Sequence, residues 1–388
     1  MSFIYRCQEC KQEFSQKEVQ YLCPICGSDY KVGMPLKGVL EVIFDYKKIA
    51  KKFDLEQPNW DLFCCVDRKY FPEYVVGSTP FFRSSRLEKK LKFENIWIKN
   101  DGLNPSGSLK DRASFLLVAE ANRIGEDTLV TASTGNAASA LASACAGGGK
   151  KAVIFVPASA PKAKLVQMRL AGATVIPVDG TYDDAFALSL QYTKEKGGLN
   201  RNTAYHPLTI EGKKTVGLEI FAQNNFQVPD VILVPVGDGV IISGVYKAFY
   251  DLQQAKIIDK MPRLICVQAE TSNAIHNYIV TGEYKNAPHP QTVADSISVS
   301  IPSNAHMARR AVLETEGFSI TVSDQEIVSA QKTLANTTGI FAEPTASSVL
   351  AALEKIQDQN MIHKKDQIVL LITGHGLKDI DTPLKYLN

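Results

Sequence analysis

The sequence alternates short apolar segments with longer segments of helical period from about residue 95 onward, and this alternation constrains the fold more than any other feature. The apolar segments that favour strands are residues 95–98, 129–131, 152–156, 174–178, 231–235, 264–268 and 368–372. Apolar residues recur at helical spacing over residues 137–146, 161–170, 182–194 and 240–252. Because strands that alternate with helices pair in parallel and are covered on both faces, we expect an α/β fold with open, doubly wound parallel sheets.

Length and charge exclude several classes of function. The 388 residues suffice for two or three domains with a large core, and a net charge of +2 offers no basic surface for nucleic acid. The N-terminus, MSFIYRCQEC, lacks the features of a secretory signal, and no apolar run is long enough to span a membrane. We therefore expect a cytoplasmic protein that binds a small ligand, with neither a membrane nor a nucleic acid as partner.

The N-terminal segment, residues 1–36, carries four cysteines in the pattern C-x2-C-x12-C-x2-C: Cys7, Cys10, Cys23 and Cys26. Each C-x2-C pair can place two thiolates on one tetrahedral ion, so the spacing predicts a structural zinc ribbon. Lys11 stands where the first turn would favour glycine. The alternative is a degenerate ribbon that keeps its turns without metal.

Three turns follow predicted strands, where ligands bind in α/β sheets. The first, TASTGNAAS (131–139), offers Ser133, Thr134 and Asn136 and suits a carboxylate, with an ordinary helix cap as an equal alternative. The second, VPVGDGVIISG (234–244), suits a phosphate, although the carboxylate of Asp238 must turn away from it. The third, LLITGHGLKD (370–379), contains His375, which we interpret as a turn histidine bonded to backbone rather than a catalytic base.

Lys110 lies between a loop of turn-forming residues and a helical segment in DGLNPSGSLKDRAS (101–114). Taken alone, a lysine in the first turn of a helix is most often solvated. Motifs in other parts of the chain change this interpretation of Lys110.

The sequence resembles the threonine synthase family of fold-type-II pyridoxal-phosphate (PLP) enzymes. The motifs that carry the resemblance are, in order, NPSGSLKDRAS, STGNAAS, IEGKKTVGLEI, GIFAEPTASSVLAAL and LITGHGLKD. The resemblance extends to the N-terminal cysteines and implies two doubly wound parallel-sheet domains, a homodimer and an amino-acid substrate. It implies a large cofactor-binding domain at 37–122 and 200–388, and a small mobile domain at 123–199.

By this resemblance, Lys110 binds the cofactor covalently, which requires a lysine that can become a neutral amine. Asn136 would bond the 3'-oxygen of the pyridine ring, and Thr373 would face the ring nitrogen. The cofactor phosphate would lie on the loop formed by Gly237, Asp238, Gly239, Val240 and Ile241. The substrate would be bound by Ser133, Thr134, Asn202 and Thr203.

The sequence departs from the family pattern at two substrate positions. Ala137 stands where the family has a threonine, and Thr209 stands where it has an arginine. Charge-assisted phosphate contacts contribute about 1.5–3 kcal/mol each, so losing a guanidinium is a large change. Either another cation replaces it, with Arg201, Lys213, Arg309 and Arg310 as candidates, or the substrate carries no phosphate ester.

The leading hypothesis is therefore a threonine-synthase-like lyase that converts O-phosphohomoserine and water to threonine and phosphate. Ala137 and Thr209 favour an alternative within the same class: an enzyme acting at Cβ, such as a serine or threonine ammonia-lyase, or a β-replacement enzyme such as cysteate synthase. A catalytically silent ligand-binding protein is an alternative of a different class.

Overall fold

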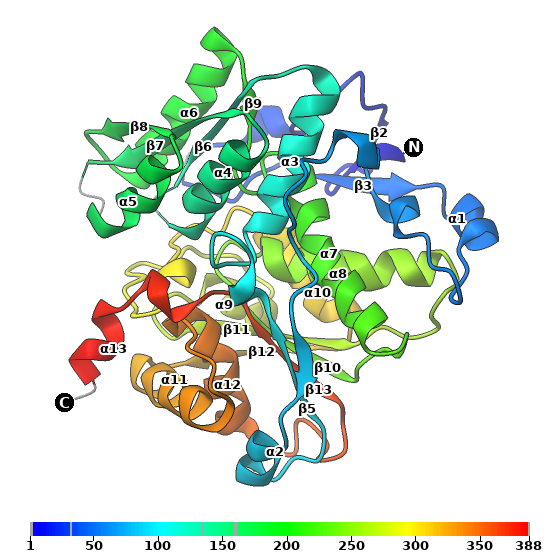
Figure 1. Ribbon diagram of the computed structural model, residues 1–388, viewed down its shortest axis with the longest axis vertical. Coiled ribbons are helices and arrows are strands. Elements are labelled where there is room, and N and C mark those ends of the chain that lie inside the picture. Colours follow the sequence, from blue (N-terminus) through cyan, green and yellow to red (C-terminus); the bar gives the residue numbers. More distant parts are fainter. Residues whose placement is uncertain (1–2, 32, 134, 159–161, 387–388) are drawn as a thin grey trace. The chain divides into compact units, whose positions relative to one another are not determined.

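The computed structural model describes residues 3–31, 33–133, 135–158 and 162–386 (Figure 1). The chain divides into two compact units, here called unit 1 (Met1–Val76 and Lys110–Lys213) and unit 2 (Gly77–Leu109 and Lys214–Asn388). The domain ranges given above stay a prediction. In the structure, unit 1 contains the N-terminal segment together with residues 110–213.

Unit 1 contains a four-stranded parallel sheet in the order β8-β7-β6-β9. Its strands are β6 (Thr128–Ala132), β7 (Lys151–Pro157), β8 (Thr174–Val178) and β9 (Leu199–Asn200). Its helices are α3 (Asp111–Ile124), α4 (Asn136–Gly147), α5 (Lys162–Leu170), α6 (Tyr182–Lys196) and the start of α7 (Leu208–Gln223). Helix α6 packs on the face formed by Val130, Val153 and Phe155, whereas α4 contacts the opposite face (Figure 1).

The N-terminal part of unit 1 forms a small antiparallel sheet in the order β2-β1-β3. Its elements are β1 (Phe3–Cys7), β2 (Glu13–Phe14), β3 (Leu40–Phe44), α1 (Tyr46–Lys52) and the short 3-10 helices η1 (Gly27–Asp29), η2 (Trp60–Phe63) and η3 (Arg68–Tyr70). The ring of Tyr21 stacks on that of Tyr205, with centroids 4.7 Å apart, and its hydroxyl accepts a hydrogen bond from the Asn200 N–H at 3.1 Å. These contacts attach the N-terminal segment to β9 and to the chain that follows it.

Unit 2 contains a six-stranded sheet in the order β12-β11-β10-β13-β5-β4, in which the edge strand β4 runs antiparallel. Its strands are β4 (Phe81–Arg83), β5 (Ile96–Asn100), β10 (Val231–Pro235), β11 (Arg263–Ala269), β12 (Phe318–Val322) and β13 (Ile368–Ile372). Its further elements are α2 (Ser85–Leu91), η4 (Asp101–Leu103), α8 (Val240–Gln254), α9 (Ala274–Thr281), η5 (Asp295–Ile297), α10 (Ala305–Glu314), α11 (Asp324–Thr338), α12 (Pro344–Ile356), η6 (Gly376–Lys378) and α13 (Asp381–Tyr386).

Alternate residues of these strands face different layers of helices. Ile96, Leu233, Ile265 and Leu370 form one core with α2, α11 and α12, which lie together on that face (Figure 1). Helix α8 contacts β10 and β11, and helix α10 contacts β11 and β12. Because the central strands are buried on both faces, they are apolar at nearly every position, which is the pattern that the sequence displays.

Local signals define where several helices begin and end. Capping boxes begin α6, where Thr181 pairs with Asp184, and α11, where Ser323 pairs with Glu326. The predicted α/β fold with parallel sheets is confirmed, and the seven predicted strands correspond to β5, β6, β7, β8, β10, β11 and β13. Among the described residues, every helix is too short or too polar to cross a membrane.

Candidate active site

Strands β10, β13 and β5 are neighbours in the sheet of unit 2, so the loops that follow them meet at one edge. The loop after β5 is fastened to the end of β13: the Leu109 N–H donates to the Thr373 carbonyl at 2.9 Å. The His375 N–H donates to the Gly107 carbonyl at 3.0 Å. Lys110 follows Leu109 directly and precedes the first residue of α3, and its side chain is half-buried. The predicted active lysine therefore stands at the end of a loop that two backbone hydrogen bonds attach to the end of β13.

Two hydroxyls at this edge have unused hydrogen-bonding capacity. The side chains of Thr373 and Ser108 are fully buried, and neither hydroxyl has a hydrogen-bond partner among the described residues. A buried hydroxyl without a partner costs about 1–3 kcal/mol. The hydroxyl of Thr373 thus fits a cofactor ring nitrogen, as the resemblance implies, since a bond to that atom would remove the cost.

The second predicted turn lies between β10 and α8 and turns tightly at Gly239. Gly239 adopts φ +86°, and a Cβ there would lie 2.8 Å from the Asn304 carbonyl oxygen, so glycine is required. The carboxylate of Asp238 accepts hydrogen bonds from the Ser303 N–H at 3.3 Å and the Ser303 hydroxyl at 3.2 Å. The carboxylate is therefore engaged by Ser303, and the N-terminus of α8 can receive an anion.

The fourth and fifth sequence motifs meet at the end of β13. The Glu343 N–H donates to the Gly374 carbonyl at 3.1 Å, and Ala342 forms an isolated bridge with His375. The Nδ1 atom of His375 accepts a hydrogen bond from the Leu377 N–H at 3.1 Å. The interpretation of His375 as a turn histidine bonded to backbone is confirmed.

In unit 1, the first predicted turn lies between β6 and α4. The Ser133 hydroxyl accepts a hydrogen bond from the Gly135 N–H at 3.2 Å, and the Ser133 N–H donates to the Phe155 carbonyl at 3.1 Å. Asn136 is the first residue of α4 and is buried. Thr134, which we predicted to bind substrate, lies outside the described residues.

Asn202, in the segment that follows β9, contacts this turn through its side-chain amide. Its Oδ1 atom accepts hydrogen bonds from the Ala132 N–H at 2.8 Å and the Thr131 hydroxyl at 3.1 Å. Its Nδ2 atom donates to the Ser189 hydroxyl at 2.7 Å. The amide therefore holds the end of β6, immediately before Ser133.

Arg201 lies beside the predicted substrate residue Thr203 and is fully buried. Its Nη1 atom donates to the Thr203 hydroxyl at 3.1 Å, and its Nε atom donates to the Ser114 hydroxyl at 3.2 Å. The Ser114 N–H in turn donates to the Lys110 carbonyl at 3.3 Å. A permanent positive charge thus adjoins the first turn of the helix that Lys110 precedes.

The other cation candidates are placed differently. The Nε atom of Arg309 donates to the Tyr278 carbonyl at 3.1 Å, and Arg310 pairs with Glu314 at 3.0 Å. Lys213 is buried in α7. Thr209, in the first turn of α7, is also buried, and its hydroxyl donates to the His206 carbonyl at 2.8 Å.

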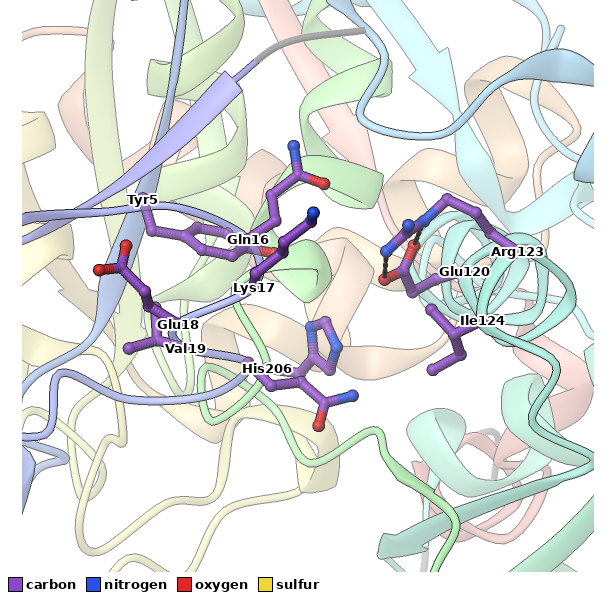
Figure 2. Close-up of a pocket in the computed structure, with 10 residues that line it drawn as sticks. Tyr5, Gln16, Lys17, Glu18, Val19, Glu120, Arg123, Ile124 and His206 are labelled. Atoms are coloured by element: carbon purple, nitrogen blue, oxygen red, sulfur yellow. Dashed lines mark hydrogen bonds and ion pairs between the residues drawn. The ribbon is translucent and has the colours of Figure 1, made fainter.

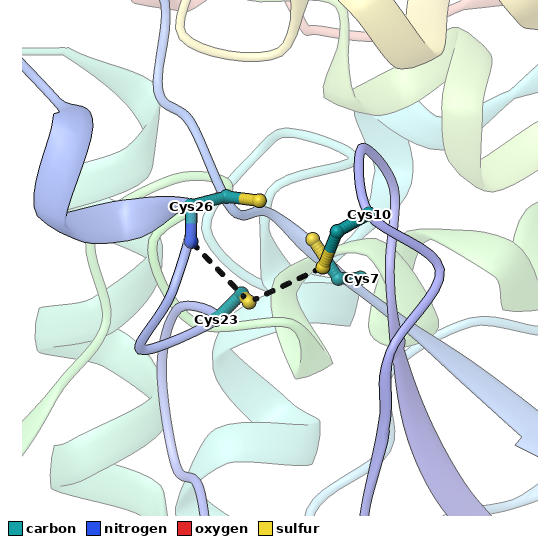
Figure 3. Close-up of side chains that lie close together, drawn as sticks. All are labelled: Cys7, Cys10, Cys23 and Cys26. Carbon is teal, nitrogen blue, oxygen red and sulfur yellow. Dashed lines mark hydrogen bonds between the residues drawn. The ribbon is translucent and has the colours of Figure 1, made fainter.

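The four N-terminal cysteines converge in unit 1 (Figure 3). Their Sγ atoms lie within 4.8 Å of one another, and those of Cys10 and Cys23 are 3.8 Å apart. Zn–S bonds of about 2.3 Å at tetrahedral angles place two sulfurs about 3.8 Å apart, so the cluster fits a zinc ion. Lys11 adopts φ 62°, the left-handed conformation for which the turn would favour glycine.

Sequence reasoning missed the residues that support these loops. Ser303 engages Asp238, and Ser108 supplies a second buried hydroxyl at the edge where β5 and β13 end. Ser303 lies about 65 positions from the residue it contacts, and no local pattern of the sequence signals such a pairing. Only the folded chain reveals them.

Comparisons with known proteins place the chain in a family. Residues 73–374 match the family model described as pyridoxal-phosphate dependent enzyme. The threonine synthase of Methanocaldococcus jannaschii is 35% identical, over 98% of this chain and 94% of that protein. The threonine synthase of Methanosarcina acetivorans is also 35% identical, over 97% of this chain and 92% of that protein.

Solved structures show the same fold in proteins of other names. A maize serine racemase has a TM-score of 0.69 at 25% identity, covering 80% of this chain and 92% of its own. The processed form of threonine deaminase isoform 2 from Solanum lycopersicum has a TM-score of 0.68 at 22% identity, covering 78% of this chain and 80% of its own. The latter likeness concerns the fold alone.

Proposed function

Because the chain belongs to the family of pyridoxal-phosphate-dependent enzymes, we propose that it is a lyase that converts O-phosphohomoserine and water to threonine and phosphate. The observation that carries this proposal is the buried guanidinium of Arg201, which bonds Thr203 at 3.1 Å and adjoins the first turn of α3. It can bind the substrate phosphate in place of the arginine missing at Thr209. The homodimer and the cytoplasmic location stay predictions.

The cofactor would be held by residues of the three predicted turns and by Lys110. Thr373 would hydrogen-bond the ring nitrogen, Asn136 the 3'-oxygen, and the loop 237–241 the phosphate, with Asp238 contributing backbone because its carboxylate engages Ser303. When bound, pyridoxal phosphate supplies an electron sink that stabilises negative charge at the substrate Cα. A neutral hydroxyl at Thr373 makes this sink weaker than a carboxylate partner would.

Residues of unit 1 would bind and orient the substrate. Ser133 and Thr134 would receive its carboxylate, with Asn202 acting on the position of Ser133 through the end of β6. Lys110, once its Nζ is a free amine, would move protons at Cα and Cβ. Phosphate would then leave from Cγ, which takes up a proton to become the methyl group; water would add its hydroxyl at Cβ, and a proton would return to Cα.

The four cysteines would hold zinc as a structural ion. Four thiolates fill a tetrahedral site and leave no open position for chemistry, so this metal would stabilise the N-terminal segment rather than react.

Thr209 and Ala137 favour a second candidate: a related enzyme acting at Cβ. The hydroxyl of Thr209 is tied to the His206 carbonyl, so this position offers no charge to a phosphate. An ammonia-lyase would release a 2-oxo acid and ammonia from serine or threonine. A β-replacement enzyme, such as cysteate synthase, would instead exchange the leaving group at Cβ for a nucleophile.

The proposal is tested by incubating the PLP-loaded protein with O-phosphohomoserine and quantifying threonine and inorganic phosphate together. We expect equal amounts of both, and neither product from Lys110→Ala, which should also lose the visible absorption of the bound cofactor. No product from O-phosphohomoserine, with 2-oxo acid formed from serine or threonine, would replace the proposal by the ammonia-lyase. Turnover by Lys110→Ala would remove the role of this lysine.

A further inference from the structure

Unit 1 contains a cavity of about 260 Å³ that the proposed reaction does not use (Figure 2). Its walls come from the N-terminal segment, including Tyr5, Lys17 and Val19, and from the last turns of α3. The nearest α3 residue in its wall, Glu120, lies ten positions after Lys110, or about 15 Å along the helix axis. The cavity is therefore separate from the loop that presents the active lysine.

The carboxylates in the wall are already engaged. Both oxygens of Glu120 accept hydrogen bonds from Arg123, at 2.6 and 2.7 Å. The carboxylate of Glu18 accepts the Ser15 N–H at 2.6 Å. By contrast, Lys17 has no ion-pair partner in the part of the chain that the structure describes, and Arg123 retains N–H groups beyond the two that bind Glu120. The wall thus holds two carboxylates that already accept hydrogen bonds, and two cations, Lys17 and Arg123, that still have N–H groups to donate.

His206 adds a buried donor to this wall. Its side chain is 1% exposed, and Nδ1 accepts the Leu208 N–H at 3.2 Å, which assigns the ring proton to Nε2. Nε2 has no hydrogen-bond partner among the described residues. Burial lowers the pKa of His206 to about 3, so the ring is neutral at physiological pH. Figure 2 shows the ring in the cavity wall near Lys17, across the gap from Ile124.

We propose that this cavity is a second ligand site, for a small carboxylic acid of amino-acid size. The carboxylate accepts a hydrogen bond from Nε2–H of His206 and is neutralised by Lys17 and Arg123. Val19 and Ile124, which also line the cavity, contact the aliphatic part of the ligand. The volume equals that of about nine water molecules of roughly 30 Å³ each, which suits such a molecule.

The site is linked to the substrate residues by one loop. The His206 N–H donates to the Asn202 carbonyl at 3.3 Å, and Asn202 holds the end of β6 before Ser133. A carboxylate bound to His206 is therefore expected to change KM for the amino-acid substrate. This coupling rests on the proposed function, whereas binding at the cavity does not.

Binding is tested by calorimetry on the PLP-loaded protein with isobutyrate and its neutral isostere isobutyramide. We expect saturable binding of isobutyrate with a dissociation constant of about 1 mM, and binding of the amide weaker by about ten-fold. Lys17→Met should weaken isobutyrate by about ten-fold, while Lys31→Met, an exposed lysine outside the wall, should not. His206→Asn, which can keep the acceptor for Leu208, should also weaken it.

Lys17 is exposed, so its variant folds even if His206→Asn does not. Isobutyrate bound only at the substrate carboxylate site would be insensitive to Lys17→Met, and that result would overturn the proposal. Equal affinities for isobutyrate and its amide, or no saturable binding, would overturn it as well. Binding that depends on Lys17 but leaves KM for the substrate unchanged would refute the coupling alone. Absence of turnover with intact binding would count against the proposed function only.

Discussion

The guanidinium of Arg201 places a permanent positive charge beside Thr203. It also donates a hydrogen bond to Ser114, in the first turn of α3. Charge-assisted bonds to phosphate contribute about 1.5–3 kcal/mol, which corresponds to about 10- to 150-fold in kcat/KM. We therefore expect Arg201→Met to lower kcat/KM for O-phosphohomoserine by that factor while the absorption of bound cofactor is retained. Steady-state kinetics with both readouts check this.

The matched control is Arg309→Met, because the Nε atom of Arg309 bonds the Tyr278 carbonyl in unit 2. It should change kcat/KM little. Equal losses in the two variants, or full activity of Arg201→Met, would show that the substrate phosphate is bound by some other group.

His206 makes the stability of unit 1 depend on pH in a defined direction. Burial lowers its pKa to about 3 in the folded chain, against about 6.5 in an unfolded one. The stabilisation is therefore complete above pH 6.5 and is lost as the pH falls toward 3, because the unfolded state then binds the proton. Between pH 7.5 and 5 the loss from this residue amounts to about 2 kcal/mol.

His206→Asn removes this titration, so its melting temperature should fall less than that of the wild type on acidification. Thermal unfolding at pH 7.5, 6.5 and 5 would measure the two slopes. Parallel slopes would mean that His206 takes up its proton equally in both states.

At the scale of elements, the four cysteines lie on two short turns, one for each C-x2-C pair, and a metal ion would join these turns. We expect one zinc ion per chain by elemental analysis, and loss of that zinc with a lowered melting temperature in Cys23→Ser. Cys64→Ser, outside the cluster, should keep the metal. A zinc-free protein with an unchanged melting temperature would instead support a degenerate ribbon that keeps its turns without metal.

Lys11 tests the first turn of the ribbon separately from the metal. A φ of 62° costs a non-glycine residue about 1–2 kcal/mol of backbone strain. Glycine would remove this strain, but it loses more backbone entropy on folding, which offsets part of the gain. Lys11→Gly should therefore raise the melting temperature slightly, as measured by calorimetry. A fall would mean that the bond from the Lys11 ammonium to the Gln8 carbonyl, at 2.6 Å, outweighs the strain.

Strands could be predicted where burial makes them apolar throughout, as in β10 and β13. Strand β12 was not predicted because four of its five positions are only half-buried, which weakens the apolar pattern. Strand β9 has two residues, too few for any periodicity. Element prediction therefore succeeded for the central strands of both parallel sheets and for the five-residue edge strand β8, and it failed for the edge strands β4, β9 and β12.

The candidate site divides in the same way. Gly239 could be predicted from local pattern because it stands in a glycine-rich turn after an apolar strand, whereas the roles of Lys110 and Thr373 were predicted from the family resemblance. Ser303, and the contact of Arg201 with Ser114, were not, since both depend on residues distant in sequence. Sequence alone could list Arg201 among four cations but could not rank it.

For the whole molecule, the fold leaves the reaction open. Structures named serine racemase and threonine deaminase share it with this chain at TM-scores of 0.69 and 0.68, whereas relatives at 35% identity are named threonine synthase. Because one fold supports several reactions, the reaction has to be identified by following which bonds of the substrate break and form.

The most direct measurement is therefore isotopic. O-phosphohomoserine is converted in ¹⁸O-labelled D₂O, and the products are analysed by mass spectrometry. Departure of phosphate from Cγ and addition of water at Cβ predict ¹⁸O in the threonine hydroxyl, none newly incorporated into phosphate, and deuterium at Cα and in the methyl group. Labelled phosphate with homoserine as the other product would mean simple ester hydrolysis. That result would contradict the proposed elimination and replacement.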